Sequence, residues 1–523
     1  MSLLLNPRDV EFNLYEFLDT EALFKNARYA DHDRETVNAV IEASLRLAEE
    51  KFASHAAEID AQEPSFDGEK VKMLPAVKDA LDAYSEAGFM GIAAEQDLGG
   101  SQFPFVVTQA TQAYFTAANV GTAGYTLLTH AAINLLTRFG SEEQRATYGQ
   151  PLVEGRYFGT MCLSEPQAGS SLSDIQTKAE PTGEEHYLIT GTKMWISGGE
   201  HELSDNIVHL VLAKVPGGPP GVKGISMFLV PKYEVNDDGS LGSHNNIALA
   251  GLNHKMGYRG TTNTILNFGE QGPCKGYLIG DLNQGLFYMF HMMNEARVAV
   301  GMGAAVLGYT GYLHSLQYAK DRPQGRHPQQ KDPTSPQIPI IEHTDIRRLL
   351  LAQKSAAEGS LSLVFLCAYL IDLQKTASDP AAAQRHELLL EILTPIAKSW
   401  PSEFCLEANK HAIQILGGYG YTREFPVERF YRDNRLNPIH EGTHGIQALD
   451  LLGRKVSMGG GAALARLVED VESTRAEAEA VAALATYSQS LRVSLQTLLV
   501  TTERLNALKA EGEINLALAN AGL

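Results

Sequence analysis

Apolar residues in the first third of the chain recur at the spacing of an α-helix. Residues 35–52 carry one broad apolar stripe, formed by Val37, Val40, Ile41, Leu45 and Leu47. Residues 72–88 repeat this pattern, and two further helices are predicted within residues 105–138. Ser141, which precedes two glutamates, is typical of an N-cap followed by an acidic first turn. The first 160 residues are therefore predicted to be helical.

The pattern changes at residue 161, where the apolar runs become short, alternating or β-branched. These runs are bounded by Gly and Pro turns and cover residues 186–190, 206–215, 224–230 and 261–268. Short apolar runs between turn residues predict strands. We therefore expect an antiparallel β-domain over residues 161–276, inserted into a helical protein.

Helical periodicity returns after the predicted β-domain. Three long helices are expected at residues 285–321, 344–375 and 381–417, with a proline-rich loop between the first two at 322–339. The longest apolar run, residues 361–371, is too short to span a bilayer and predicts a buried helix. Three glycines at 459–461 lead into an Ala-, Leu- and Glu-rich tail that is predicted to be helical. The fold class is thus α+β and mainly helical, with four parts: an N-terminal helical domain (1–160), a middle β-domain (161–276), a helical bundle (277–455) and an additional helical tail (456–523).

Composition and charge narrow the classes of function. Of the 523 residues, 44% are hydrophobic and 20% are charged, as in an ordinary soluble globular protein. The net charge of −19 disfavours binding to nucleic acid or to an anionic membrane, and no stable membrane insertion is expected. The four cysteines are scattered without metal-type spacing, so we expect a reduced, cytoplasmic protein with no metal site. The N-terminus resembles neither a signal peptide nor a basic transit peptide.

The segment from Gln414 to Lys455 holds the clearest candidate for catalytic chemistry. Gly417 and Gly418 follow an apolar helical run and are predicted to end it as left-handed caps. Further on, His440-Glu441-Gly442-Thr443 precedes a second apolar run, residues 446–452. A carboxylate beside small residues at the start of a helix has two interpretations: a catalytic base held near backbone N–H groups, or a residue that stabilises the helix dipole. For an arbitrary glutamate the second interpretation is the more common one.

Two earlier segments carry residues suited to a flat, phosphate-bearing cofactor. Within residues 161–170, the Ala168-Gly169-Ser170 turn can present backbone N–H groups to an anion. Residues 193–199 contain Trp195 together with a serine and two glycines, and a flat ring favours an aromatic wall with hydrogen-bond partners at its edge. Each segment also has a simpler interpretation, because most Gly/Ser turns bind nothing and a tryptophan in a hairpin usually packs in the core.

Taken together, these segments resemble the acyl-CoA dehydrogenase family. The C-terminal signature of that family is matched at every constrained position, by Gln414, Gly417, Gly418, Gly420, Tyr421, Glu424, Arg429 and Asp433. Its N-terminal signature, LTEPxAGSD, is matched by residues 163–171, which read LSEPQAGSS. The resemblance covers roughly residues 80–455 and agrees with the order of helical, β and helical segments. It implies the acyl-CoA dehydrogenase fold, and the additional N-terminal residues and tail resemble the larger bacterial branch of the family.

The resemblance implies FAD-dependent α,β-dehydrogenation of an acyl-CoA thioester, as in fatty acid β-oxidation. The enzyme is expected to be a homodimer or homotetramer that passes electrons to an electron-transfer flavoprotein. Residues implied to bind FAD within one chain are Met161, Leu163, Ser164, Gly169, Ser170, Trp195, Ser197, Thr443 and Gly445. Residues implied to act at the FAD shared with a neighbouring subunit are Arg322, Gln414, Gly417 and Gly418. Residues implied to contact the substrate are Ser170, Arg297, His440, Glu441 and Gly442.

Glu441 lies at the position of the family's general base, which removes the α-proton while hydride leaves Cβ for flavin N5. An exposed glutamate has a pKa near ~4.3 and is a poor base, so the site requires an apolar pocket. The resemblance implies that the Glu441 N–H and a ribityl hydroxyl of FAD stabilise the enolate oxygen, and Gly442 permits close approach of the backbone.

Some members carry the base on an earlier helix, directly before the arginine that matches Arg297. That position is Ala296 in this chain, and Glu295 is expected to point away from the substrate because one residue turns a helical side chain by about 100°. Arg297 itself matches an arginine near the catalytic glutamate, with an ordinary salt bridge as the alternative.

Three positions depart from the family pattern. Ser171 replaces the usual Asp of the first signature, His440 stands where Tyr commonly precedes the base, and His444 lies three residues after Glu441. Either imidazole can alter the pKa of Glu441 or narrow the pocket, although a histidine beside a site more often only packs there. Two other functions remain open: a same-fold flavin oxidase or monooxygenase, and a non-catalytic acyl-CoA- or FAD-binding protein. The retained Glu441 argues against a monooxygenase, and a non-catalytic protein is expected to have lost Glu441 or Arg322.

Overall fold

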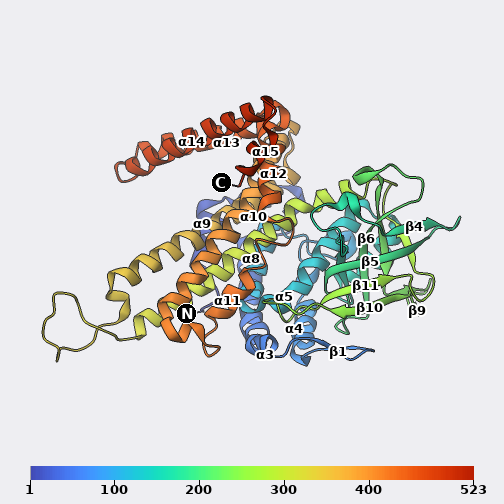
Figure 1. Cartoon of the computed structure of the whole chain (residues 1–523), viewed down its shortest axis with the longest axis horizontal. Helices are drawn as coiled ribbons and strands as arrows, with labels where there is room; N and C mark the ends of the chain where they lie inside the picture. Colours follow the sequence, from blue (N-terminus) through green and yellow to red (C-terminus); the bar gives the residue numbers. More distant parts are fainter. Residues whose placement is uncertain (1, 523) are drawn as a thin grey trace.

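The computed structural model describes residues 2–522, except for the side chains of His291 and Met292. A body of long helices has a β-domain on one side and a helical tail that projects away from it (Figure 1). The first helical part contains α1 (Pro7–Phe12), α2 (Arg34–Leu47), α3 (Ala56–Ala61), α4 (Pro75–Glu86), α5 (Phe105–Phe139), α6 (Glu142–Gln144), α7 (Gln150–Val153) and a ribbon of β1 (Ser65–Phe66) and β2 (Val71–Lys72). Ser141 caps α6 with a full capping box, as its sequence context predicts.

Helix α5 forms much of one wall of the site and consists of two limbs. The backbone of Asn119 is non-helical, with φ −162° and ψ 89°, so the helix breaks there. The two limbs lie against each other: Thr126 Oγ1 on the second limb donates to Gln112 Oε1 on the first at 3.4 Å. The Tyr84 hydroxyl joins both limbs by bonding to Gln112 and to His130. The two helices predicted within residues 105–138 are therefore present as the two limbs of α5, which face each other.

The β-domain is built on an eight-stranded sheet in the order β10-β11-β5-β12-β7-β6-β3, with β4 beside β5 and β6. Its strands are β3 (Tyr157–Cys162), β4 (Lys178–Pro181), β5 (Tyr187–Ser197), β6 (Asn206–Lys214), β7 (Ile225–Pro231), β10 (Ile247–Leu252), β11 (Asn263–Phe268) and β12 (Lys275–Leu278), and β8 (Tyr233–Val235) pairs separately with β9 (Leu241–His244). Most neighbours are antiparallel as expected, but β3 pairs with β6 in parallel. The parallel pair arises because residues 163–205 return the chain to the end of the sheet from which β3 started.

Three long helices form the bundle: α8 (Gly285–Asp321), α9 (Thr344–Thr376) and α10 (Pro380–Leu416). They pack on one another, and α8 also packs on α5. Two shorter helices follow, α11 (Val427–Asn434) and α12 (His444–Gly453). In the described part of the chain, α9 is the one helix that is long and apolar enough to cross a membrane, and 56% of its apolar window is buried within the protein. This burial favours the prediction of a core helix for residues 361–371.

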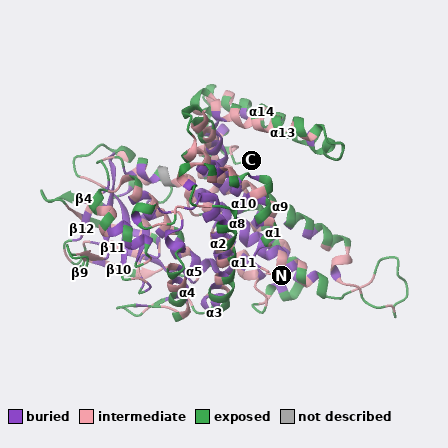
Figure 2. Cartoon of the chain, turned by 180° about the vertical axis from the view of Figure 1, so that it is seen from behind, coloured by how far each residue is buried: buried purple, intermediate pink, exposed green. Residues whose placement is uncertain are grey.

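The tail consists of α13 (Ala462–Glu479), α14 (Ala485–Ala510) and α15 (Ile514–Ala519). Helices α13 and α14 pack against each other, and the short helix α15 returns to α12. Figure 2 shows that α14 and the turn before it are mostly exposed, whereas most residues of α13 are half-buried. The exposed apolar residues there include Val481, Leu484, Tyr487, Leu491, Val493, Leu498 and Val500.

Candidate active site

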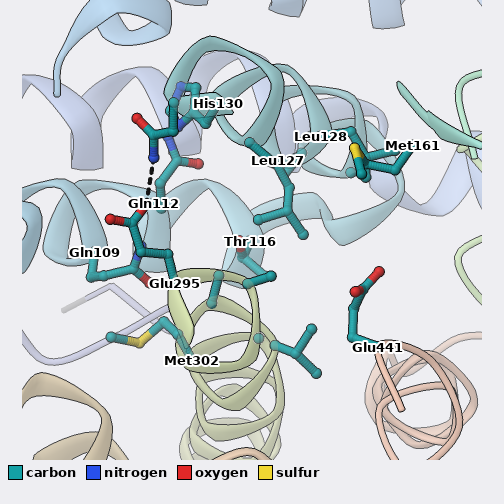
Figure 3. A pocket seen from close by; sticks show the side chains of 18 of the residues that line it. Gln109, Gln112, Thr116, Leu127, Leu128, His130, Met161, Glu295, Met302 and Glu441 are labelled. Carbon is teal, nitrogen blue, oxygen red and sulfur yellow. Dashed lines mark hydrogen bonds between the residues drawn. The ribbon is translucent and has the colours of Figure 1, made fainter. Parts of the chain in front are cut away.

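A largely apolar cavity of about 120 Å³ lies between the two limbs of α5, helix α8 and the segment that carries Glu441. Glu441 points toward it from one side (Figure 3). Met161, at the end of β3, and Leu163 line the same cavity. The structure therefore brings the predicted base together with the first two predicted flavin contacts around one apolar space.

The Glu441-Gly442 turn has an uncommon backbone conformation. Glu441 has φ +50° and Gly442 has φ +85°, both in the region that favours glycine. A Cβ on Gly442 would lie 2.6 Å from Gln447 Nε2, so a side chain is excluded there. Gln447 Nε2 donates to the carbonyl oxygens of Glu441 at 3.0 Å and Gly442 at 3.3 Å, and Lys398 Nζ donates to Gly442 O at 2.7 Å. Two buried side chains thus hold the backbone of the turn and leave the Glu441 carboxylate to the cavity.

Burial raises the pKa of Glu441, and the nearby cations Lys398 and Arg297 oppose that rise. An elevated carboxyl pKa is what a general base for a weakly acidic C–H group needs. Burial in turn lowers the pKa of Lys398 to about 8, while Glu441 acts in the opposite direction. The carboxylate and the ammonium are therefore electrostatically coupled across the turn.

Arg297 on α8 forms the salt bridge that was considered as its alternative role, and its contact with substrate stays a prediction. Its Nη1 lies 2.7 Å from Asp450 Oδ2 on α12, in a salt bridge that is almost fully buried. Its charge also acts on Glu441, whose pKa it lowers. The arginine thus ties α8 to α12 and contributes positive potential near the carboxylate.

The two histidines near Glu441 have different surroundings. His440 lines the cavity, and its Nε2 lies 3.0 Å from Asn437 Oδ1. Burial lowers the pKa of His440 to about 3, so the ring is uncharged at neutral pH and acts as part of the wall. His444 instead faces Glu403, 3.5 Å away, and begins α12 directly after its N-cap Thr443. Of the two imidazoles, it is His440 that narrows the pocket.

The expectation that Glu295 points away from the substrate is wrong. Glu295 lines the cavity on the side opposite Glu441 (Figure 3). The cavity is lined by a broad face of α8, which includes residues 295, 296, 299, 300, 302 and 303. Two successive residues of this helix can therefore both face the cavity, although their side chains point in directions about 100° apart. The Glu295 carboxylate accepts a hydrogen bond from Asn134 and lies 3.0 Å from Lys375 Nζ. These partners hold it at the far end, away from Glu441.

The predicted flavin contacts Ser164, Trp195 and Ser197 lie next to each other where β5 meets the segment after β3. Met194 N donates to Ser164 O at 3.0 Å, and Asn263 Nδ2 donates to Ser197 Oγ at 3.3 Å. Trp195 falls at a β-bulge between β5 and β11, with φ +66°, and its side chain is 58% exposed. A bulge turns a side chain out of the ladder. A large indole exposed beside backbone and hydroxyl groups fits a flat ring system such as a flavin, and the core position considered from sequence is wrong.

A buried ion pair anchors this surface from behind. Lys193 Nζ donates to Glu165 Oε1 and to Leu163 O, both at 3.0 Å. The same carboxylate accepts hydrogen bonds from Gln176 N at 2.6 Å and from Thr177 N at 3.0 Å. Burial acts to raise the pKa of Glu165, but Lys193 and Thr177 outweigh it and hold the pKa at about 2. The ionised pair fixes the segment after β3 to strand β5.

The predicted anion-binding turn is exposed. Ala168 N donates to Glu165 O at 3.0 Å, which folds the turn back on itself, and Gly169 and Ser170 lie at the surface. Ser171 Oγ donates to Asp174 Oδ2 at 2.6 Å, within the short turn that follows. The remaining predicted flavin contacts, Thr443 and Gly445, lie at the start of α12, next to Glu441.

The second group of predicted FAD contacts lies in another part of the chain. Arg322 directly follows α8 and lies near Leu416, while Gln414 in the last turn of α10 and Gly417 just after that helix lie on the surface. Gly417 has φ +61° and ψ −133°, which is not left-handed helical, and Gly418 has no positive φ, so the predicted left-handed caps are wrong. Both glycines instead begin a 3₁₀ turn over Gly417–Tyr421, most of which lies at the surface.

Sequence reasoning missed Lys398 and Gln447, although both hold the Glu441 turn. Lys398 follows the apolar run 392–397 within α10, and a lysine at a buried helix position signals a specific partner. Gln447 occupies a core-facing position of α12, which is a weaker signal. The partner of Lys398 is not apparent from the sequence, because Gly442 lies on an element distant in the chain, and the short-range contacts of Gln447 depend on how the Glu441-Gly442 turn folds.

Three family models match this chain: the N-terminal (residues 34–156), middle (160–270) and C-terminal (283–456) domains of acyl-CoA dehydrogenase. The chain is 36% identical to 3-methylmercaptopropionyl-CoA dehydrogenase of Ruegeria pomeroyi over 90% of its length and 79% of that protein's. It is 34% identical to a broad-specificity linear acyl-CoA dehydrogenase of Mycobacterium tuberculosis, with 89% and 77% covered. The structure of butyryl-CoA dehydrogenase from Megasphaera elsdenii superimposes with a TM-score of 0.64 at 22% identity, covering 80% of this chain and 97% of that one. The predicted likeness to the larger bacterial branch is confirmed.

Proposed function

Because this chain belongs to the acyl-CoA dehydrogenase family and is an enzyme of that class, we propose that it uses FAD to convert an acyl-CoA into the trans-2-enoyl-CoA, with Glu441 as the base. The observation that carries the proposal is the position of Glu441. It faces an apolar cavity of about 120 Å³ whose wall it shares with Met161 and Leu163. The family members are flavoproteins, and FAD is the flavin that the signature residues imply.

The residues around Glu441 have separate tasks in this proposal. The thioester places its α-carbon beside the carboxylate, which takes the α-proton as the β-hydrogen leaves with its electron pair. The apolar lining of the cavity desolvates Glu441, which raises its pKa toward the working range. The Glu441 N–H has no hydrogen-bond partner among the described residues and is free to donate to the thioester carbonyl oxygen. A bound flavin supplies the acceptor for the β-hydride.

The size of the cavity favours a short acyl group. An apolar cavity of about 150 Å³ takes up benzene, so 120 Å³ accommodates roughly five or six heavy atoms. The similar proteins named above act on 3-methylmercaptopropionyl-CoA, butyryl-CoA and linear acyl-CoAs, which agrees with an unbranched short chain. We therefore expect the best thioesters to carry four to six carbons, roughly the number that fills this volume.

The partners are part of the same proposal. The electrons pass to an electron-transfer flavoprotein, and the enzyme works in the cytoplasm as a homodimer or homotetramer. Two observations support an oligomer: Arg322 and Gly417 lie on elements other than the strand that carries Trp195, and apolar residues are exposed on α14 and the turn before it. A neighbouring chain that covers these surfaces would complete each cofactor site.

Anaerobic titration of the purified flavoprotein with acyl-CoAs of graded length tests this function. We expect the oxidised-flavin absorbance to bleach on addition of a short saturated acyl-CoA, with one equivalent of enoyl-CoA formed. Absence of bleaching with every chain length would contradict the proposal. Fast reoxidation of the bleached protein by air would instead identify an oxidase.

Substitution of Lys398 by Met should slow the reaction and shift its pH dependence. The Gly442 carbonyl loses the shorter of its two hydrogen bonds, so the carboxylate is less well placed, and we expect kcat to fall by about 10- to 100-fold. Activity requires ionised Glu441, so it is present above the pKa of that carboxyl and lost as the pH falls through it. Loss of the Lys398 charge removes one of the two cations that oppose the rise of this pKa, while Arg297 remains and His440 is uncharged. The acid limb of kcat/KM should therefore move to higher pH.

Lys398→Arg is the matched control, because it keeps a cation and a donor at this position. We expect its acid limb to lie close to that of the native protein even if kcat falls. A Lys398→Met protein whose pH profile is unchanged would show that the ammonium has no electrostatic influence on the base.

A further inference from the structure

The end of the cavity far from Glu441 is polar, although the cavity as a whole is apolar. Its polar residues come from both limbs of α5 and from α8: Gln109, Gln112, His130, Asn134 and Glu295. Figure 3 shows Gln109, Gln112, His130 and Glu295 on the side of the cavity opposite Glu441. An unsubstituted hydrocarbon chain gains nothing from such groups and must leave them unpaired when it displaces water. The far end therefore needs its own explanation.

Most of these groups are satisfied within the protein. Gln112 donates to the Tyr84 hydroxyl and accepts from Thr126, and the Tyr84 hydroxyl lies 3.3 Å from His130 Nε2. Asn134 donates to Glu295, which also pairs with the ammonium of a lysine 3.0 Å away. These contacts fix the positions of the polar groups. A structural role is therefore enough to explain why these groups are present.

Gln109 is the exception. Its residue is only 4% exposed, and its side chain lines the cavity. The amide makes no hydrogen bond to another described residue, and its polar atoms are open to the cavity, although an amide carries two donors and an acceptor that favour pairing. A buried polar side chain without a partner, directed into a ligand-sized cavity, indicates that the ligand provides the partner.

The charges around this end restrict what the ligand can carry. The described residues that line the cavity include no lysine and no arginine, whereas Glu295 brings a carboxylate. His130 is uncharged near neutral pH, because burial lowers its pKa to about 4. A second carboxylate on the ligand would be buried next to Glu295 and would compete with it for the ammonium of Lys375, which is strongly unfavourable.

We propose that this cavity takes acyl groups that carry an uncharged hydrogen-bonding group, a hydroxyl or a carbonyl oxygen, at the end far from the thioester, and that Gln109 recognises that group. The amide can donate to either oxygen and can accept from a hydroxyl. This inference rests on the proposed function, since it concerns the acyl group of the same substrate. Gln109 is a specificity residue and takes no part in the proton or hydride transfer.

The test compares thioesters that differ by one exchange of methyl for hydroxyl. The pairs are 4-hydroxybutanoyl-CoA with pentanoyl-CoA and 5-hydroxypentanoyl-CoA with hexanoyl-CoA, and glutaryl-CoA supplies a carboxylate. For at least one pair we expect the hydroxyacyl-CoA to have a kcat/KM about tenfold above its partner, because it pairs the Gln109 amide. Glutaryl-CoA should have the lowest kcat/KM of the set.

Gln109→Met keeps the side-chain volume and removes the amide. We expect it to reverse the preference, favouring the methyl-ended thioester, and to be at least as stable as the native protein, since no protein group loses a partner. Gln112→Met provides the contrast. It should lose thermal stability, because Tyr84 and Thr126 lose their partner, and keep the preference for hydroxyl.

Three results would overturn the inference. The first is an equal kcat/KM ratio in the native and Gln109→Met proteins, and the second is a Gln109→Met protein less stable than the native one, which would indicate a structural role. The third is a preference for glutaryl-CoA. In each of these cases turnover of hexanoyl-CoA shows that the proposed function stands. Absence of turnover with every thioester would instead overturn the proposed function and this inference with it.

Discussion

Substitution of Glu441 by Gln is expected to lower kcat by about 10²- to 10⁴-fold with every acyl-CoA, the range that a general base contributes. The amide has nearly the same shape as the carboxylate but cannot take the α-proton. The backbone turn should survive, because Lys398 and Gln447 hold it through the carbonyl oxygens of Glu441 and Gly442. Steady-state turnover with saturating electron acceptor measures the loss, and flavin content and thermal unfolding verify that the variant is intact.

Glu295→Gln is the matched control for this variant, since the same cavity has Glu295 on its opposite side. Its carboxylate is engaged by Asn134 and Lys375, so we expect a much smaller loss of kcat than in Glu441→Gln. A larger loss in Glu295→Gln would reverse the assignment of the base. Equal, small losses in both would show that neither carboxylate takes the α-proton.

Substitution of Lys193 by Met is expected to lower the free energy of unfolding by about 3–5 kcal/mol, because it leaves Glu165 as a buried charge without its cation. In the native protein the pKa of Glu165 is about 2, below its unfolded value, so the pair contributes stability above pH about 4.5 and loses it as the pH falls toward 2. Without Lys193 that carboxyl is easier to protonate when folded. The difference in stability between the two proteins should therefore narrow as the pH falls. Chemical denaturation at several pH values measures it.

The double variant Glu165→Gln with Lys193→Met removes both charges and serves as the control. It should recover part of the lost stability, because Gln still accepts from Thr177 and no charge remains buried. The single variant should also retain less flavin after gel filtration, because the segment before Ser164 is no longer tied to Lys193. A single variant as stable as the native protein would contradict the structural role of the pair.

Much of the fold is predictable from the sequence, because periodicity reports which face of an element is buried. The bounds of α8 are those predicted, 285–321, and the two limbs of α5 fall within the predicted range 105–138. The parallel pairing of β3 with β6 is not predictable, since it depends on where the chain re-enters the sheet. The backbone conformation of Gly417 is also not predictable from the sequence. A glycine can adopt several regions of φ and ψ, and the loop that follows selects one of them.

The candidate site is predictable where a signature fixes the residue type, and less so where three-dimensional packing decides the role. Glu441 stands out because it lies in a recognisable segment. The helical rotation of about 100° per residue wrongly predicts that Glu295 points away from the cavity, because the cavity is lined by a face of α8 wider than a single row of side chains. Lys398 signals by its apolar surroundings only that it has a partner, and Gln109 carries no local signal. Their roles follow from partners, or the lack of a partner, that only the folded chain reveals.

A single anaerobic turnover with a short acyl-CoA deuterated at either C2 or C3 tests the central claim most directly. If Glu441 takes the α-proton while the β-hydrogen leaves as hydride, deuterium at either carbon should slow the bleaching of the flavin. The enoyl-CoA should have lost one deuterium from the labelled carbon, and Glu441→Gln should not bleach on this timescale. Bleaching that yields no enoyl-CoA, or that proceeds at the native rate in Glu441→Gln, would contradict the account.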